Sequence, residues 1–482
     1  MNLLSPTPLF LGAKGLDILN LLDFILLPFL VWGLVALFSA IKKSRYKNSV
    51  VAQYFIPALV VRLIGAFLTA CLYQYYYGYG DTTWYYFGTL DIANAFFTKG
   101  FSTGMEMLLY PYEMYSEEAK SNITIFLFFR NPSMLAVVKT GALFGFLTFG
   151  SFIGSSFGIT CIAFIGSWML YRVLQDIYPH LHRELAIAIL FVPSVCFWGT
   201  GLMKDPLSMG GVGMFVYGLY FLFYKPGARG LALPLIALII GLYYSIVVKA
   251  YIAVAVVPAA IIWLSLMYKN KIKNKTLQAL SIPLLLAMGI GFGGIALQQV
   301  SSTFKLEDIA LEAAKTQWWI ALNSELDGGM GYSLGVMEPT VSGMLKKAPA
   351  AINVALFRPY PWEARKIIVI PSAVESMFTL FFTFFVFFKI GFFKTFVEMA
   401  KDPTVLFCLI FAVIFAFAVG FSSMNFGALA RYKIPALPFY FSALVILLDT
   451  KGREARIAAF AISQGINSPG ITKLPPGTLP LQ

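Results

Sequence analysis

Long apolar runs, each near the length of a membrane-spanning helix, dominate the hydrophobic pattern of the chain. A helix needs about 20 consecutive apolar residues to cross a bilayer, whereas the strands of a membrane barrel show only short alternating segments. The sequence therefore predicts an all-α polytopic membrane protein. Candidate spans lie at 19–41, 53–77, 135–154, 156–176, 185–202, 206–224, 230–247, 249–268, 277–298, 367–389, 403–421 and 434–450.

Two hydrophilic stretches, 78–134 and 299–366, interrupt these runs, and we expect each to carry short helices. The chain start lacks a basic segment and a cleavage site, so we expect the run at 19–41 to remain as an extra N-terminal span. The stretch after Lys451 is polar and contains Pro and Gly, which predicts a loose tail.

Composition supports the membrane interpretation, because 59% of the residues are hydrophobic and only 12% are charged. An average soluble domain is about 25% charged. A cytosolic enzyme, a disordered chain and a secreted disulfide scaffold are therefore excluded. The four cysteines all lie inside apolar runs without a CxxC pair, which indicates structural thiols.

The net charge of +13 comes mostly from short loops between apolar runs. This placement is typical of topology signals, so we expect no nucleic-acid partner. The positive-inside rule puts the strongest basic clusters in the cytoplasm, with the N-terminus and the loop 78–134 outside. These clusters are 42–47, 269–275, 394–401 and 451–456.

Counting spans from both ends gives opposite sides for Lys204 if 135–154 and 156–176 both cross the membrane. We therefore expect 135–154, which carries Lys139 and several glycines, to lie in the outer interface or re-enter it. Eleven crossings remain, with both long loops outside and the C-terminus inside.

The first group of residues suited to chemistry surrounds Asp81, just past the outer end of the 53–77 span. Glycines on its N-terminal side allow close approach of a ligand, and the aromatic neighbours Tyr79, Trp84 and Tyr85 suit sugar faces or lipid headgroups. A carboxylate here can act as a general base or bind a metal. The alternative is an aromatic interface belt with a solvated aspartate.

The second group is Trp198 with Lys204 and Asp205, between two apolar runs with almost no linker. A charge at such a place is costly unless it lines a wet cavity or the interface. Asp205 is a candidate second carboxylate in the cavity of Asp81, and Lys204 is a candidate partner for a phosphate. The alternative is a tight hairpin with a snorkelling lysine.

The third group is Arg431, Tyr432 and Lys433, at the predicted outer end of the last span. Basic residues on the outer face oppose the usual bias, and a lipid phosphate or pyrophosphate would suit them. Headgroup anchoring is the alternative. Arg130, at the end of the first loop, is a further candidate phosphate contact or else a loop anchor.

The fourth group lies in the second outer loop, where two prolines stiffen a polar and aromatic segment. Substrate binding and simple packing are equally good interpretations of this group. Its members are Arg358, Tyr360, Trp362 and Glu363, and Glu375 follows inside the next span, where it needs a partner or water.

These positions resemble the GT-C superfamily of polytopic glycosyltransferases, which includes protein O-mannosyltransferases and lipid A aminoarabinose transferases. The resemblance covers roughly 53–225 in the order of elements, and the rest more loosely. It rests on Asp81 after a span, on Lys204-Asp205-Pro206-Leu207 opening a later span, and on Arg431-Tyr432 near the outer surface.

One position departs from the pattern of that superfamily. Several relatives carry two adjacent acidic residues in the first loop, whereas Asp81 is followed here by Thr82. Asp91, ten residues further on, is the candidate substitute.

The resemblance implies transfer of a sugar from a polyprenyl phosphate or pyrophosphate to a hydroxyl or amine of a glycan, lipid or protein acceptor. Asp81 would be the base or position the acceptor, and Asp205 would assist. Lys204, Arg431 and Lys433 would contact the leaving phosphate. We assign no cofactor, and a divalent metal held by Asp81 and Asp205 stays an open alternative.

Under this hypothesis the chain divides into segments around one catalytic module. The expected location is a bacterial inner membrane, with the site on the periplasmic or outer face. The segments are an extra helix and basic loop (1–52), a GT-C-like module (53–225) with the first outer loop (78–134), further spans (226–298), the second outer loop (299–366), C-terminal spans (367–450) and a cytoplasmic tail (451–482).

Two other functions remain open. A polymerase or ligase of lipid-linked glycans would share the outer cavity and the long second loop. A flippase or transporter should place charges midway through several spans and break helices in pairs. Only Lys139, Lys249 and Glu375 approach mid-span positions, and the sequence predicts no paired breaks.

Overall fold

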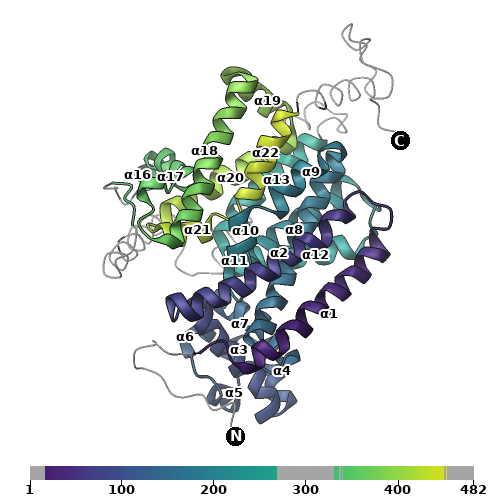
Figure 1. Ribbon diagram of the computed structural model, residues 1–482, viewed down its shortest axis with the longest axis vertical. Coiled ribbons are helices and arrows are strands. Elements are labelled where there is room, and N and C mark those ends of the chain that lie inside the picture. Colours follow the sequence, from purple (N-terminus) through teal and green to yellow (C-terminus); the bar gives the residue numbers. More distant parts are fainter. Residues whose placement is uncertain are drawn as a thin grey trace.

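The computed structural model describes residues 17–268, 331–335 and 340–449, together with Trp318, Glu338 and Gly452. Every regular element in these ranges is helical, as expected (Figure 1). The basic cluster 269–275, the run 277–298, most of 299–340 and nearly all of the tail after 450 lie outside the described residues.

The N-terminal span is α1 (Leu21–Arg45), and a loop leads from it to α2 (Ala52–Cys71). Asn20 and Asp23 form a capping box at the start of α1, and Lys42, Lys43 and Arg45 occupy its last turn, where cations complement the helix dipole. α2 continues through a π-helical turn, η1 (Leu72–Tyr77).

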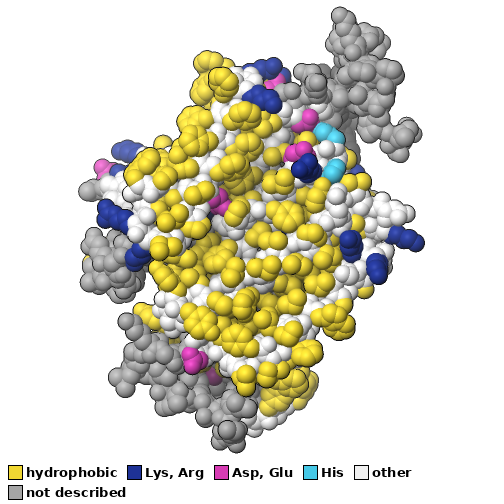
Figure 2. All heavy atoms as spheres, viewed as in Figure 1, with side chains coloured by type: hydrophobic (Ala, Val, Ile, Leu, Met, Phe, Trp, Pro, Cys, Tyr) yellow, Lys and Arg dark blue, Asp and Glu magenta, His cyan; other side chains and the backbone are white. Residues whose placement is uncertain are grey.

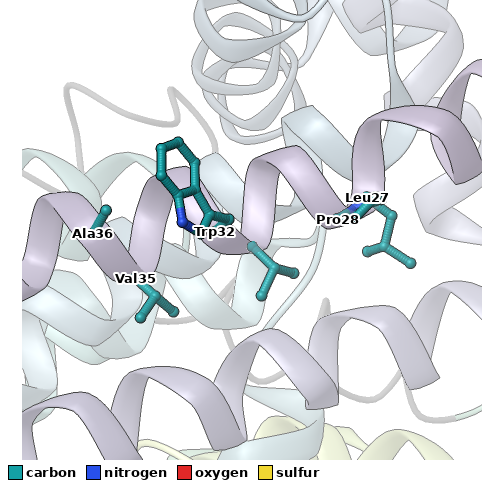
Figure 3. Close-up of a pocket in the computed structure, with 6 residues that line it drawn as sticks. Leu27, Pro28, Trp32, Val35 and Ala36 are labelled. Carbon is teal, nitrogen blue, oxygen red and sulfur yellow. The ribbon is translucent and has the colours of Figure 1, made fainter.

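α1 is mostly turned toward the surroundings, because only 6% of its apolar segment is buried. A shallow apolar hollow of about 610 Å³ runs along it where Pro28 interrupts the helical hydrogen bonds (Figure 3). α1 therefore faces lipid. The hollow is lined by Leu27, Pro28, Val31, Trp32, Val35 and Ala36.

The first outer loop folds into short helices, as expected, and these gather at the bottom of Figure 1. Ser116 caps one of them, and Asn131 with Pro132 starts the next helix, α7 (Pro132–Leu147). The loop helices are α3 (Asp81–Thr98), α4 (Phe101–Leu109), α5 (Glu117–Ser121) and α6 (Phe126–Arg130), with a 3-10 turn η2 (Tyr112–Met114).

The centre of the bundle is formed by α8 (Phe152–Ile177) and α11 (Lys204–Leu219), which continues into η4 (Tyr220–Tyr224). Glycines let these two helices touch through their backbones: a Cβ atom on Gly166 would lie 2.0 Å from the carbonyl oxygen of Gly210. α12 (Ala232–Val247) and α13 (Ala250–Tyr268) pack against α11, and α20 (Pro403–Ser422) packs against α13.

The predicted span at 185–202 is not one helix, which corrects that expectation. It is split into α9 (His182–Leu190) and α10 (Pro193–Trp198) because Pro193 has no N–H to continue the helical ladder. Arg62 Nη1 donates to the Leu190 carbonyl at 2.9 Å, and the Ser194 N–H donates to Glu375 Oε2 at 2.9 Å. A charged side chain thus satisfies one backbone group on each side of the break.

The last span is also interrupted. α22 (Leu437–Leu448) begins later than the apolar run at 434–450 suggested, and it follows α21 (Phe426–Tyr432) across a bend of 65°. α10 contacts α21 and α9 contacts α22, so the two broken segments lie side by side. The expectation that the helices show no paired breaks was therefore wrong.

The described part of the second outer loop also forms short helices. It leads into α18 (Ile370–Ile390) and α19 (Phe392–Lys401), at the top of Figure 1. The loop contains α16 (Val341–Lys346), α17 (Ala348–Phe357), η6 (Pro361–Glu363) and η7 (Ile367–Val369).

Seven helices in the described ranges are long and apolar enough to cross a membrane, or eight if α21 and α22 form one span. α7, α12 and α17 are apolar but shorter. Hydrophobic side chains cover the visible face of the molecule (Figure 2). The chain is therefore a polytopic helical membrane protein, and the count of eleven crossings stays a prediction.

Contacts between distant residues agree with the predicted sides of the membrane. On the predicted cytoplasmic side, His180 Nε2 lies 2.5 Å from Asp449 Oδ2, and the Tyr178 hydroxyl donates to Asp402 Oδ1 at 2.7 Å. On the predicted outer side, the Ser151 hydroxyl donates to Asp23 Oδ1 at 2.6 Å. Residues predicted to share a side therefore do meet.

The same contacts bear on α7. Ser133 at its start accepts from Lys204, and Ser151, just beyond its end, is bonded to Asp23. Lys204 and Asp23 are both predicted to be outside. The two ends of α7 thus lie with outer groups, which supports an in-plane or re-entrant segment at 135–154.

Candidate functional site

Arg431 lies between the two carboxylates that the sequence singled out. Its Nη2 donates to Asp81 Oδ2 at 3.1 Å and to Asp205 Oδ2 at 3.3 Å, and its Nε lies 3.4 Å from the same Asp205 oxygen. The three residues come from the starts of α3 and α11 and from the end of α21. The structure therefore brings Asp81, Asp205 and Arg431 into one cluster.

Lys249 holds the other oxygen of Asp205. Its Nζ donates to Asp205 Oδ1 at 2.5 Å, and its ammonium also lies 4.0 Å from the centre of the Tyr432 ring. Asp205 is completely buried and Lys249 nearly so. We did not predict Lys249 as a site residue, although a cation between two apolar runs needs a buried anionic partner, and that need was the available signal.

Tyr73 is a second site residue that the sequence analysis missed. Arg431 Nη1 donates to its hydroxyl at 2.9 Å, and its ring packs against Gly80. A Cβ atom on Gly80 would lie 2.5 Å from that ring, so only glycine fits. The turn before Asp81 therefore holds the aromatic side chain that orients Arg431.

Lys204 borders this cluster and has no carboxylate partner in the described part of the chain. Its Nζ donates to the Ser133 hydroxyl at 2.8 Å, and it forms no ion pair within the described ranges. Lys204, Lys249 and Arg431 are three cations beside the two carboxylates Asp81 and Asp205. One net positive charge remains, which suits an anionic ligand.

The three side chains of the cluster differ in how far they are exposed to solvent. The side chain of Asp81 is 53% exposed, that of Arg431 is 15% exposed, and that of Asp205 is 0% exposed. A substrate from the outer side would therefore meet Asp81 first. Asp205 acts through the groups that it holds.

Lys433 does not lie with Arg431. Its amine is buried and donates to the Ser376 hydroxyl at 2.8 Å, with the Arg358 carbonyl at 3.5 Å. The two cations are two residues apart across the end of α21, and side chains at that spacing on a helix do not face each other. The structure therefore separates two residues that we expected to share one phosphate.

The residues of the second outer loop form a cluster of their own. Arg358 pairs with Glu363, and the Tyr360 and Trp362 rings stack with centroids 4.9 Å apart. Burial raises the pKa of Glu363, but hydrogen bonds from Arg358 and from the Tyr360 N–H outweigh it, so the net pKa lies below its usual value. This cluster meets Lys433 through the Arg358 carbonyl.

The structure also gives the surroundings of the remaining candidate site residues. Tyr79 is exposed, and Arg130 lies 4.4 Å from the centre of the Phe126 ring within α6. Three aromatic candidates pack against neighbouring rings: Trp84 against Phe87, Tyr85 against Phe128, and Trp198 against Phe197.

Asp91 does not act as a second acidic residue beside Asp81. Ten residues of helix separate the two by about 15 Å along the axis of α3. Its carboxylate accepts from the Thr124 N–H at 2.8 Å and from the Thr124 hydroxyl at 2.7 Å. Burial raises the pKa of Asp91 to about 7, although these hydrogen bonds oppose the shift. Asp91 braces the first outer loop.

The donor set offers little to a divalent metal. Within the described ranges, no group of three or more His, Cys, Asp and Glu side chains comes together. Asp81 and Asp205 already share the guanidinium of Arg431, and Lys249 occupies the other Asp205 oxygen. A metal would have to displace these cations, so the residues as arranged do not fit one.

Comparison with known proteins finds no matching family model, no matching curated protein and no matching solved structure.

Proposed function

We propose that this chain is a membrane glycosyltransferase that moves a sugar from a polyprenyl phosphate or pyrophosphate to an acceptor on the outer face of the membrane. The bridge from Arg431 to both Asp81 and Asp205 carries the proposal. It assembles a half-exposed carboxylate and a surplus of positive charge at the predicted outer ends of several helices. Glycosyl transfer from a lipid phosphate needs both features.

In this proposal Asp81 is the general base. It takes the proton of the acceptor hydroxyl or amine while the acceptor atom attacks the anomeric carbon of the sugar. The bond from that carbon to the phosphate oxygen breaks, and the lipid phosphate leaves with the electron pair. Lys204 and Arg431 stabilise the negative charge that develops on the phosphate.

Asp205 has a positioning role, because it is fully buried and bonded to Arg431 and Lys249. It fixes the guanidinium at the inner wall of the site. When Asp81 takes a proton it loses its negative charge, and Asp205 is then the one carboxylate of the pair that still neutralises Arg431. The positive charge available to the leaving phosphate therefore rises as the phosphate is released.

The outer loops would supply the acceptor side. Tyr79 is 47% exposed and Trp362 is 74% exposed, and aromatic faces of this kind suit sugar rings. The GT-C fold, the eleven crossings and the periplasmic location belong to this proposal.

The test is a transfer assay with the full chain purified into lipid. Radiolabelled polyprenyl-phosphate sugars serve as donors and cell-envelope fractions as acceptors. We expect wild type to transfer label. A product with one added sugar supports single transfer, whereas a long product supports the polymerase or ligase alternative. No transfer from any donor by folded protein contradicts the proposal.

The paired helix breaks favour transport as a second candidate function. Discontinuous helices frame substrate sites in many transporters. Here the α9–α10 and α21–α22 breaks lie side by side, with Arg62, Glu375 and Lys433 buried around them. Movement of a labelled lipid-linked sugar across proteoliposomes, without any transfer, would favour this candidate.

A further inference from the structure

An apolar groove of about 230 Å³ lies between α9, the start of α10, α18 and α22, away from the Asp81 cluster. Its walls are hydrophobic, and Figure 2 shows acidic atoms within the apolar field over these helices. Two carboxylates, Glu184 and Glu375, line it together with Ile187, Phe191, Phe378, Phe382, Phe441 and Val445.

Glu375 is only half satisfied in this groove. Its Oε2 accepts from the Ser194 N–H, but its Oε1 has no hydrogen-bond partner within the described ranges, and its residue is 8% exposed. The hydroxyl oxygen of Ser194 is buried and unpaired as well. Leaving buried polar atoms unpaired is costly. A molecule bound in the groove could satisfy both oxygens with a hydrogen-bond donor.

The groove runs from a predicted outer end to a predicted cytoplasmic end. Glu375 lies five residues after the start of α18, or about 7.5 Å along its axis, near the predicted outer end. The stacked rings of Phe378 and Phe382, 5.6 Å apart, continue the wall inward, with Phe441 6.0 Å from Phe378. Glu184, near the predicted cytoplasmic end, marks the far end of the groove. Its shape suits a hydrocarbon chain with a polar end at Glu375.

We propose that this groove binds one chain of an outer-leaflet aminophospholipid, whose primary ammonium donates to Glu375 Oε1 and to the Ser194 hydroxyl. An ammonium is compact and has three donors, so it can satisfy both atoms. The quaternary head of phosphatidylcholine has no N–H, and the net charge of phosphatidylglycerol opposes a carboxylate. Lys366, which lies shortly before α18, is exposed. The proposal does not depend on glycosyl transfer.

Retained lipid tests the proposal. The full chain is equilibrated in vesicles with equal amounts of phosphatidylethanolamine, phosphatidylcholine and phosphatidylglycerol that carry the same chains. It is then extracted in detergent, and bound lipid is counted by mass spectrometry. We expect wild type to retain phosphatidylethanolamine about tenfold over phosphatidylcholine, the order expected for a charge-assisted hydrogen bond. Equal retention, or a preference for either other lipid, overturns the proposal.

Glu375→Gln keeps an acceptor for the Ser194 N–H but turns an amide toward the ammonium, so the preference should fall to about equal retention. Glu184→Gln is the matched control, because it makes the same change at the other end of the groove and should keep the tenfold preference. Equal effects of the two substitutions contradict the proposal.

Ser194→Ala keeps the backbone N–H that donates to Glu375 Oε2 and removes only the free hydroxyl. It is the second test variant if Glu375→Gln does not fold. We expect it to lower the preference about threefold. An unchanged preference in Ser194→Ala overturns the two-point recognition of the ammonium.

Discussion

Arg431 Nη2 lies 3.3 Å from Asp205 Oδ2, although 226 residues separate them in the sequence. The same nitrogen lies 3.1 Å from Asp81 Oδ2. One guanidinium therefore joins the first outer loop, the central helix α11 and the broken C-terminal span, and the charges of the candidate site depend on it.

Replacement of Arg431 by lysine should weaken the site although the charge is kept. A lysine carries its three N–H groups on one nitrogen, so it cannot span Asp81, Asp205 and Tyr73 as the planar fork of the guanidinium does. We expect polyprenyl-phosphate binding to weaken about tenfold and transfer to fall further, measured by lipid binding and by the transfer assay. Lys401→Arg, at an exposed helix end, is the control, and equal binding by both variants would refute the role of Arg431.

Lys249 should matter for stability as well as activity. Lys249→Met leaves a buried carboxylate with Arg431 alone, and breaking a buried pair costs about 3–5 kcal/mol. Thermal unfolding in detergent should show a clear loss. The double variant Lys249→Met with Asp205→Asn should recover most of the stability but not the transfer activity. A single variant as stable as wild type would mean that the pair contributes little.

Gly80→Ala tests whether the Tyr73 ring orients Arg431. The added Cβ would lie 2.5 Å from that ring and must displace it. We expect transfer to fall at least tenfold while the protein stays folded, because the strain is local. Gly33→Ala, where nothing lies within 4 Å of the new atom, should leave transfer unchanged. Full activity of Gly80→Ala would remove Tyr73 from the site.

The first outer loop should lose stability as the pH rises. Burial raises the pKa of Asp91 to about 7 in the folded protein, against 3.8 as its ordinary value. The folded state therefore binds more protons between these values, and its stability falls across that window and is lowest above about pH 7. Limited proteolysis of the loop should be faster at pH 8 than at pH 5.

Asp91→Asn is the matching variant, because the amide cannot ionise. Its proteolysis rate should change much less between pH 5 and pH 8 than that of wild type, whereas Glu113→Gln, an exposed change in the same loop, should behave as wild type. A pH response that survives in Asp91→Asn would assign it to another group.

The meeting of Asp81, Asp205 and Arg431 could be predicted because charge bias placed all three on one side of the membrane. Tyr73 and Lys249 could not be predicted in the same way. Hydropathy shows which residues lie in a span but not which face of the helix they occupy. For the same reason, hydropathy could not show that Lys433 and Arg431, two residues apart at the end of a helix, point in different directions.

The helix breaks escaped prediction for a different reason. Apolar side chains continue across Phe191, Val192 and Pro193, so the hydropathy shows no gap. The freed backbone groups are satisfied by Arg62 and Glu375, which lie far away in the sequence. A break of this kind can be recognised only in the fold, where the side chains that satisfy the freed backbone groups are seen.

The most direct test of the central claim compares donor binding and transfer in wild type and Asp81→Asn, both in lipid. Loss of one negative charge should leave polyprenyl-phosphate binding as tight or tighter, while loss of the base should lower the transfer rate at least 100-fold. Glu117→Gln, an exposed change in the same outer loop, should transfer at the wild-type rate. Equal transfer by Asp81→Asn and wild type would contradict the account.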